Sequence, residues 1–203
     1  MIEIRIDGPG KNALGTELIR SLTQQISDAA GAPILLTGSG DAFSAGLNLK
    51  EVASLDVDTM AGFLERLETF FRLLWLYPGP TAAAVNGHAI AGGCILAMAC
   101  DHRIATTNER ARIGLNEVAI GLRFSPALLR FVQNLLSPSQ ISEAILGAGL
   151  HAPADALRLG LVDALSDDPV ATGRTHLESL AQHPSAAYAA TKADLRAEVM
   201  TVS

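Results

Sequence analysis

Two short apolar segments, each running into a glycine-containing turn, constrain the fold more than any other feature. They read APILLTG at residues 32–38 and TAAAVNG at residues 81–87. Apolar runs of this length that end at turn residues are typical of buried strands. Between them, TMAGFLERLETFFRLLWL at residues 59–76 repeats apolar residues at helical spacing and is followed by the helix-breaking YPGP. Strands that alternate with helices predict a single α/β domain.

The rest of the chain continues this alternation. We expect a strand at residues 2–6, a turn at DGPGKN, and a helix carrying Leu14, Leu18, Leu22 and Ile26 that ends near Gly31. The segment SGDAFSAGLNLKEV is expected to be an irregular loop. Further segments are expected to be a core helix (AGGCILAMAC), a strand (DHRIATT), two helices (LLRFVQNLL and SPSQISEAILGA), a helix running through Gly160 into a strand (ADALRLGLVDAL), and polar helices over the last forty residues.

Composition limits the classes of function. The chain has 203 residues, 49% of them hydrophobic and 18% charged, which suits one domain with a large core. The net charge is −6 and the basic residues form no run, so we expect no nucleic-acid partner. No apolar stretch approaches the roughly 20 residues of a membrane helix, and the N-terminus does not resemble a signal peptide. Cys94 and Cys100 are read as buried thiols, and a cytoplasmic location is expected.

Two segments share one design, in which an apolar strand enters a glycine turn with small residues and a helix then begins. They read ILLTGSGDAFSAGLNLKE and AAAVNGHAIAGGCILAM. Small residues let a ligand approach the backbone, and the free N–H groups of a helix start can stabilise a developing negative charge. Each turn alone is commonplace, and a purely structural role is the favoured interpretation of either one by itself.

Together these segments resemble the enoyl-CoA hydratase/isomerase family, the crotonases. The resemblance includes KNALG, AFSAGLNLKE, AVNGHAIAGGCILAMACDHRIA and ADALRLGLVD, and therefore spans most of the chain. It implies an α/β fold built as a spiral of ββα units with C-terminal helices, in a single domain over residues 1–203. The core would cover about residues 1–135 and the helical part about 136–203, which we expect to be abbreviated because family members are usually longer. It also implies acyl-CoA thioester substrates and a homotrimer or a dimer of trimers.

The resemblance also implies where the thioester binds. The family holds the thioester oxygen between two backbone N–H groups, which match Leu47 and Gly92 here. CoA would contact the segment Ala45-Gly46-Leu47-Asn48-Leu49, where Asn48 replaces a more frequent Asp. Lys11 matches a position for a cation near the CoA phosphates, although a solvated surface lysine explains it equally well. We expect no metal, nucleotide or flavin, because His and Cys lack ligand spacing and no phosphate-binding loop occurs.

The acids distinguish between reactions of the family. Its hydratases use two glutamates, whose positions here are Ile95 and Glu117, and an aliphatic side chain cannot activate water. The segment IGLNE is similar to the mitochondrial Δ3,Δ2-enoyl-CoA isomerases, which implies that Glu117 is the base and that Asn116 lines the pocket. Dienoyl-CoA isomerases add an aspartate where this chain has Ser125. The alternatives are a hydratase-like or other crotonase reaction, and a non-catalytic acyl-CoA-binding subunit.

The apolar neighbours of Glu117 predict a raised pKa, because burial disfavours the charged form. From these neighbours alone, a glutamate turned to solvent at a strand end is the favoured interpretation, and the two loops reverse this preference. Among the other titratable residues, His88 is expected to be a hydrogen-bonded turn residue. Glu65 and Glu68 are assigned to the solvated side of a helix and are reserve candidates if the chain hydrates enoyl-CoA.

Overall fold

The computed structural model describes residues 1–197, in which a five-stranded parallel sheet forms the centre. Its strands lie in the order β1-β2-β4-β6-β8. They are β1 (Ile2–Ile6), β2 (Ile34–Gly38), β4 (Thr81–Val85), β6 (His102–Thr106) and β8 (Ala164–Ser166). Every residue of β2 and β4 is buried, as expected for strands covered on both faces. The prediction of an α/β fold is therefore confirmed.

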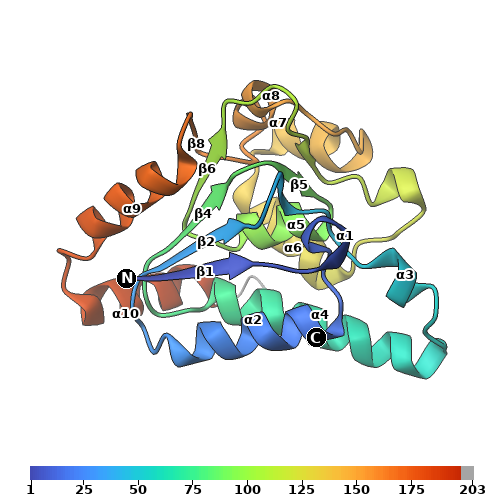
Figure 1. Cartoon of the computed structure of the whole chain (residues 1–203), viewed down its shortest axis with the longest axis horizontal. Helices are drawn as coiled ribbons and strands as arrows, with labels where there is room; N and C mark the ends of the chain where they lie inside the picture. The colour runs from blue at the N-terminus through green and yellow to red at the C-terminus, as the bar shows by residue number, and fades with distance from the viewer. Residues whose placement is uncertain (198–203) are drawn as a thin grey trace.

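Helices cover the two faces of this sheet (Figure 1). On one face lie α2 (Thr16–Asp28) and α4 (Val57–Trp75), which pack against each other over the main core. On the other face α9 (Pro169–Leu180) packs against β2, β4 and β6. Successive side chains of a strand alternate between faces, so Leu36 belongs to the main core and Leu35 to a smaller cluster with Leu177 of α9. Both faces are buried because each is apolar.

A second sheet contains three short parallel strands in the order β3-β5-β7. These strands are β3 (Ala42–Ser44), β5 (His88–Ile90) and β7 (Ile113–Gly114). The expected irregular loop at residues 39–52 therefore contains β3 and the short helix α3 (Leu49–Val52). Sequence patterns did not reveal β5 and β7, because two or three residues are too few to show an alternation.

The remaining helices are mostly short. They are α1 (Pro9–Asn12), α5 (Gly92–Met98), the 3₁₀ turn η1 (Val118–Ile120), α6 (Pro126–Leu135), α7 (Pro138–Ile141), the π-helical turn η2 (Ser142–Leu146), α8 (Pro153–Arg158) and α10 (Ser185–Arg196). The expected core helix is confirmed, since all seven residues of α5 are buried. The expectation of a helix through Gly160 was wrong. Helix α8 ends at Arg158, and Gly160 adopts a φ of +74°, a left-handed conformation that ends a helix.

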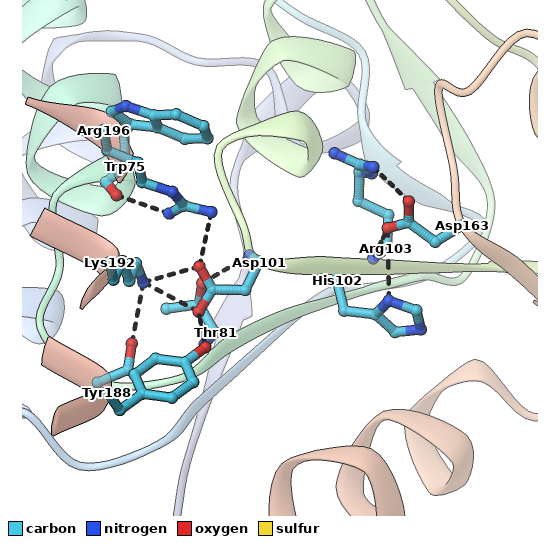
Figure 2. A network of polar contacts seen from close by, with 10 residues as sticks. Trp75, Thr81, Asp101, His102, Arg103, Asp163, Tyr188, Lys192 and Arg196 are labelled. Carbon is cyan, nitrogen blue, oxygen red and sulfur yellow. Dashed lines mark hydrogen bonds and ion pairs between the residues drawn. The ribbon is translucent and has the colours of Figure 1, made fainter. Parts of the chain in front are cut away.

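The C-terminal helices follow the expected pattern as far as the structure describes them, and residues 198–203 of the expected helical part lie outside that description. Helix α10 is anchored by Asp101, which follows α5 (Figure 2). Lys192 and Arg196 each approach Asp101 Oδ1 at 2.8 Å, and the Tyr188 hydroxyl donates to Oδ2 at 2.8 Å. The Arg196 guanidinium lies 3.7 Å from the centre of the Trp75 ring. These contacts join α10 to the C-terminal ends of α4 and α5.

Candidate active site

The three-stranded sheet brings three distant segments to one place. Strands β3, β5 and β7 run parallel and end at Ser44, Ile90 and Gly114, so the residues that follow them emerge at the same edge. These followers are residues 45–47, residues 91–92 and residues 115–117. The sequence-predicted residues Leu47, Gly92 and Glu117 therefore meet because each lies two or three positions after a strand of this sheet.

Hydrogen bonds from the segment that precedes α2 fix the path of the first loop, residues 45–47, and of the residues before it. Asn12 is buried and donates from its amide to the carbonyl oxygens of Ser39 and Ala42, both at 2.9 Å. Leu14 donates to the Gly46 carbonyl at 2.7 Å and accepts from the Asn48 amide at 3.0 Å. Sequence reasoning gave Asn12 no role and placed Leu14 on the first helix. Both residues instead fix the path of the loop that contains Leu47.

These bonds determine where the Leu47 amide points. In a trans peptide the N–H lies opposite the preceding carbonyl, so a Gly46 carbonyl aimed at Leu14 turns the Leu47 N–H away from it. Likewise, the Ala91 carbonyl accepts from Ile95 N at 3.0 Å, which directs the Gly92 N–H out of the start of α5. No protein atom among residues 1–197 accepts a hydrogen bond from either amide. Both donors are therefore available to a ligand.

The two amides belong to backbones in close contact. Gly46 has a φ of +85°, and a Cβ atom there would lie 2.6 Å from the Ile90 carbonyl oxygen and 3.4 Å from Gly92 N. Only glycine fits both the conformation and the space. Ala91 has a φ of +49° and a ψ of −120°, an unusual conformation for a residue with a side chain. The strained turn at Ala91 starts α5 beside Gly46.

These elements line a cavity of about 890 Å³ whose wall is mostly apolar. Of the residues predicted from the sequence, the lining includes Ala45, Leu47, Leu49, Gly92, Ile95, Asn116 and Glu117. Gly46 and Asn48 lie in the same loop but do not line the cavity, and the Asn48 side chain instead accepts from Glu51 N at the start of α3. Lys11 also lies away from the lining. It is exposed and bonds to Asp41 Oδ2 at 2.8 Å, so the structure gives it a surface ion pair.

Glu117 is the deeply buried carboxylate of this cavity. Its exposed fraction is 8%, and its buried Oε2 atom has no hydrogen-bond partner among the described residues. Burial raises the pKa of Glu117 from an ordinary 4.5 to about 7, and a hydrogen bond from its own backbone N–H opposes part of this rise. The neighbouring Asn116 Oδ1 is also buried and has no partner in the described part of the chain. The predicted burial of Glu117 is confirmed.

The other titratable side chains take different places. His88 lies in β5 and not in a turn as expected, but its Nδ1 accepts from Arg112 N at 3.1 Å, which confirms a hydrogen-bonded role. Burial raises the pKa of the Cys94 thiol to about 12, so this cysteine stays protonated and unreactive. Glu65 is exposed as expected, whereas Glu68 is half-buried and lines the cavity. The assignment of Glu68 to the solvated face was therefore wrong.

The part of the chain that the structure describes contains neither a metal-binding cluster nor a membrane-spanning helix. No cluster of three or more His, Cys, Asp or Glu side chains there is arranged to hold a metal ion. None of the helices formed by residues 1–197 combines the length and the apolar character that crossing a bilayer requires.

An apolar cavity with one buried acid and two free backbone donors defines a site for acid–base chemistry on an apolar substrate with a carbonyl group. The family model described as enoyl-CoA hydratase/isomerase matches residues 1–202. The chain therefore belongs to the enoyl-CoA hydratase/isomerase family. The resemblance seen in the sequence is confirmed.

Individual relatives agree with this assignment. Human mitochondrial enoyl-CoA delta isomerase 1 is 31% identical over 201 residues, which cover 95% of this chain and 66% of that protein. A putative enoyl-CoA hydratase of Thermus thermophilus is 35% identical over 168 residues, covering 79% of this chain and 65% of the relative. The crystal structure of human mitochondrial Δ3-Δ2-enoyl-CoA isomerase matches with a TM-score of 0.93 at 27% identity, over 98% of this chain and 80% of that one. The fold is therefore the crotonase fold, and the chain spans just under two thirds of these two curated relatives.

Proposed function

We propose that this chain is a Δ3,Δ2-enoyl-CoA isomerase, which moves the double bond of a 3-enoyl-CoA into conjugation with the thioester. The observation that carries this proposal is the asymmetry of the cavity wall. Glu117 is a buried carboxylate with a free oxygen, while the position that matches the other glutamate of a hydratase is Ile95, 2% exposed and aliphatic. One base can shift a proton, but Ile95 cannot activate water.

The reaction needs one proton to leave C2 and one to arrive at C4. Ionised Glu117 takes the C2 proton, and the electron pair of the broken C–H bond delocalises through the thioester as a dienolate. The negative charge then lies largely on the thioester oxygen, where the N–H groups of Leu47 and Gly92 stabilise it. Protonated Glu117 returns the proton to C4, and the double bond moves to C2–C3. The carboxylate is regenerated, so the cycle consumes no water and no cofactor.

The raised pKa of Glu117 suits both halves of this cycle. A carboxylate with its ordinary pKa of 4.5 is a weak base and gives up its proton readily, whereas a pKa of about 7 improves proton abstraction without preventing return. Asn116, whose Oδ1 also has no partner among the described residues, lies beside it and lines the same wall. Its amide can therefore contact either the carboxylate or the substrate.

A second candidate reaction is hydration of a 2-enoyl-CoA. The observation in its favour is that Asn116 Oδ1 and Glu117 Oε2 are neighbouring buried acceptors without a described donor, which a water molecule can satisfy. Relatives named as hydratases are also as similar to this chain as those named as isomerases. A non-catalytic acyl-CoA-binding role is the third alternative, against which the raised pKa of Glu117 counts.

One experiment separates these alternatives. The purified chain is given 3-enoyl-CoA and 2-enoyl-CoA separately, and conjugated product and 3-hydroxyacyl-CoA are measured in each reaction. Conjugation of the first substrate without appreciable hydration of the second supports the isomerase. Faster hydration supports the second candidate, and binding without either reaction supports the third.

We also propose that the chain assembles as a homotrimer or a dimer of trimers, which rests on the family resemblance. Exposed apolar side chains such as Val118 and Leu146 offer surface for such contacts. Analytical ultracentrifugation at micromolar concentration measures this, and a monomer would contradict it.

A further inference from the structure

A carboxylate interrupts the apolar side of α4 that faces the cavity. The lining positions follow the spacing of a single helix face and are Met60, Phe63, Leu64, Leu67, Glu68 and Phe71. Five of these side chains are apolar, and the sixth, Glu68, is half-buried between them. A carboxylate on such a wall loses part of its hydration, which costs free energy unless a partner replaces the lost hydrogen bonds.

The described part of the protein does not supply that partner. Within residues 1–197, Glu68 forms no hydrogen bond and no ion pair, unlike Glu143, which binds Arg158. Arg123, in the segment between η1 and α6, lines the same cavity and likewise forms neither contact with the described residues. The cavity lining therefore includes a half-buried carboxylate and an exposed guanidinium, and neither has a partner among the described residues.

We propose that this cavity selects acyl-CoA substrates whose acyl chain carries a hydroxyl group beyond the reacting carbons, with Glu68 as the specificity-determining residue. The inference rests on the proposed function, because it assumes that an acyl chain enters the cavity. A hydroxyl group in the acyl chain can donate to the Glu68 carboxylate, which when ionised can only accept. A carboxylate in the chain is repelled by Glu68, and the exposed Arg123 in the same cavity lining disfavours an ammonium group, so the cavity favours a neutral donor.

The preference for a hydroxylated chain follows from the effect of an unsubstituted alkyl chain on the hydration of Glu68. An alkyl chain lying against the carboxylate removes water from it and returns no hydrogen bond. Sites built to bond a hydroxyl reject the analogue that lacks it for this reason. Because Glu68 is only half-buried, we expect the preference for the hydroxylated chain to be roughly 10- to 100-fold, the range of one hydrogen bond to a charged group.

The test compares 3-enoyl-CoA thioesters of equal chain length that carry a hydroxyl at successive positions beyond the double bond, or none. For the wild type, we expect kcat/KM at one or more positions to exceed that of the plain chain by roughly 10-fold or more. Glu68→Leu should abolish this preference and improve turnover of the plain chain. Glu68→Gln keeps an acceptor and should retain part of the preference, so it provides the test if Glu68→Leu does not fold.

Glu65→Leu is the matched control, since Glu65 lies one turn earlier on α4, is exposed and does not line the cavity. It should keep the wild-type preference. The proposal is overturned if the wild type prefers no hydroxyl position, or if Glu68→Leu and Glu68→Gln both keep the full preference. Calorimetric Kd values of saturated acyl-CoAs with and without the hydroxyl test the same recognition without turnover. A chain that binds hydroxylated acyl-CoA more tightly but isomerises nothing would refute the proposed reaction and uphold this inference.

Discussion

Replacing Glu117 by glutamine should abolish the proposed isomerisation and stabilise the fold at the same time. The substitution keeps the size of the side chain but removes the ionisable group. A folded-state pKa of about 7, against an ordinary value of 4.5, corresponds to roughly 3 kcal/mol of unfolding free energy at about 1.4 kcal/mol per pH unit. This figure is the cost of keeping the buried carboxylate charged.

The sign follows from proton binding. The folded chain binds the Glu117 proton more tightly than the unfolded chain, so the stability of the wild type decreases as pH rises from about 4.5 to about 7. Above that range the penalty is complete, and below it the penalty is absent. Glutamine is neutral throughout. Glu117→Gln should therefore be more stable than the wild type by up to roughly 3 kcal/mol near pH 8 and equal to it near pH 4.5.

Two measurements check this prediction. Urea unfolding at a series of pH values gives the difference in unfolding free energy between wild type and variant. Isomerisation of 3-enoyl-CoA should fall at least roughly 100-fold in Glu117→Gln, the lower range for loss of a general base. In the wild type, kcat/KM should rise with pH and level off above about 7, as the ionised base accumulates.

Glu65→Gln, on the exposed side of α4, serves as the control and should change neither quantity. A stability difference between Glu117→Gln and wild type that is the same at every pH would refute the argument from the buried charge. Wild-type isomerisation by Glu117→Gln would refute the one-base mechanism even if the stability result held.

Three further substitutions test other parts of the structure. Gly46→Ala should lower kcat and the melting temperature, because the added Cβ would lie 2.6 Å from a carbonyl oxygen. The control is Gly40→Ala, since Gly40 has a similar φ of +72° but no atom within 4 Å of an added Cβ. Asp101→Asn should lower the free energy of unfolding by roughly 3–5 kcal/mol in urea titrations, because it leaves buried cations without their counter-charge. As a control, Glu143→Gln removes a surface ion pair and should lower it by less than about 1 kcal/mol. Ile95→Glu should add slow hydration of 2-enoyl-CoA, measured as 3-hydroxyacyl-CoA, at the expense of stability.

The central strands and long helices were predictable because each carries its own periodic signal. The segments APILLTG and TAAAVNG became β2 and β4, and the helix over residues 59–76 became α4 with a shift of two residues at its start. The small sheet was not predictable in this way. Strands β5 and β7 contain three and two residues, and they exist because parallel pairing with a neighbour satisfies their backbone groups.

The site was only partly predictable for a related reason. Glu117 and the amides of Leu47 and Gly92 could be chosen from the resemblance to a family. The apolar neighbours of Glu117 alone did not decide between a buried and a solvent-facing glutamate. The position of Glu68 depends on how α4 is rotated about its axis, and one helical turn contains both the exposed Glu65 and the cavity-lining Glu68. The pattern of α4 alone placed both on the polar side. Rotation of a helix is settled by its packing, which a local pattern does not contain.

The small sheet explains why one carboxylate is sufficient for the proposed chemistry. Backbone amides do not titrate, so the donors at Leu47 and Gly92 stabilise negative charge equally well at any pH and impose no charge of their own on the apolar wall. Glu117, the buried ionisable group beside these donors, is then free to cycle between its two protonation states, which the cavity holds close in free energy by raising the pKa of Glu117 to about 7. A second carboxylate at position 95 would raise that pKa further by repulsion and compete for the same proton. In the proposed reaction, an aliphatic residue there leaves Glu117 as the group that exchanges the proton with the substrate.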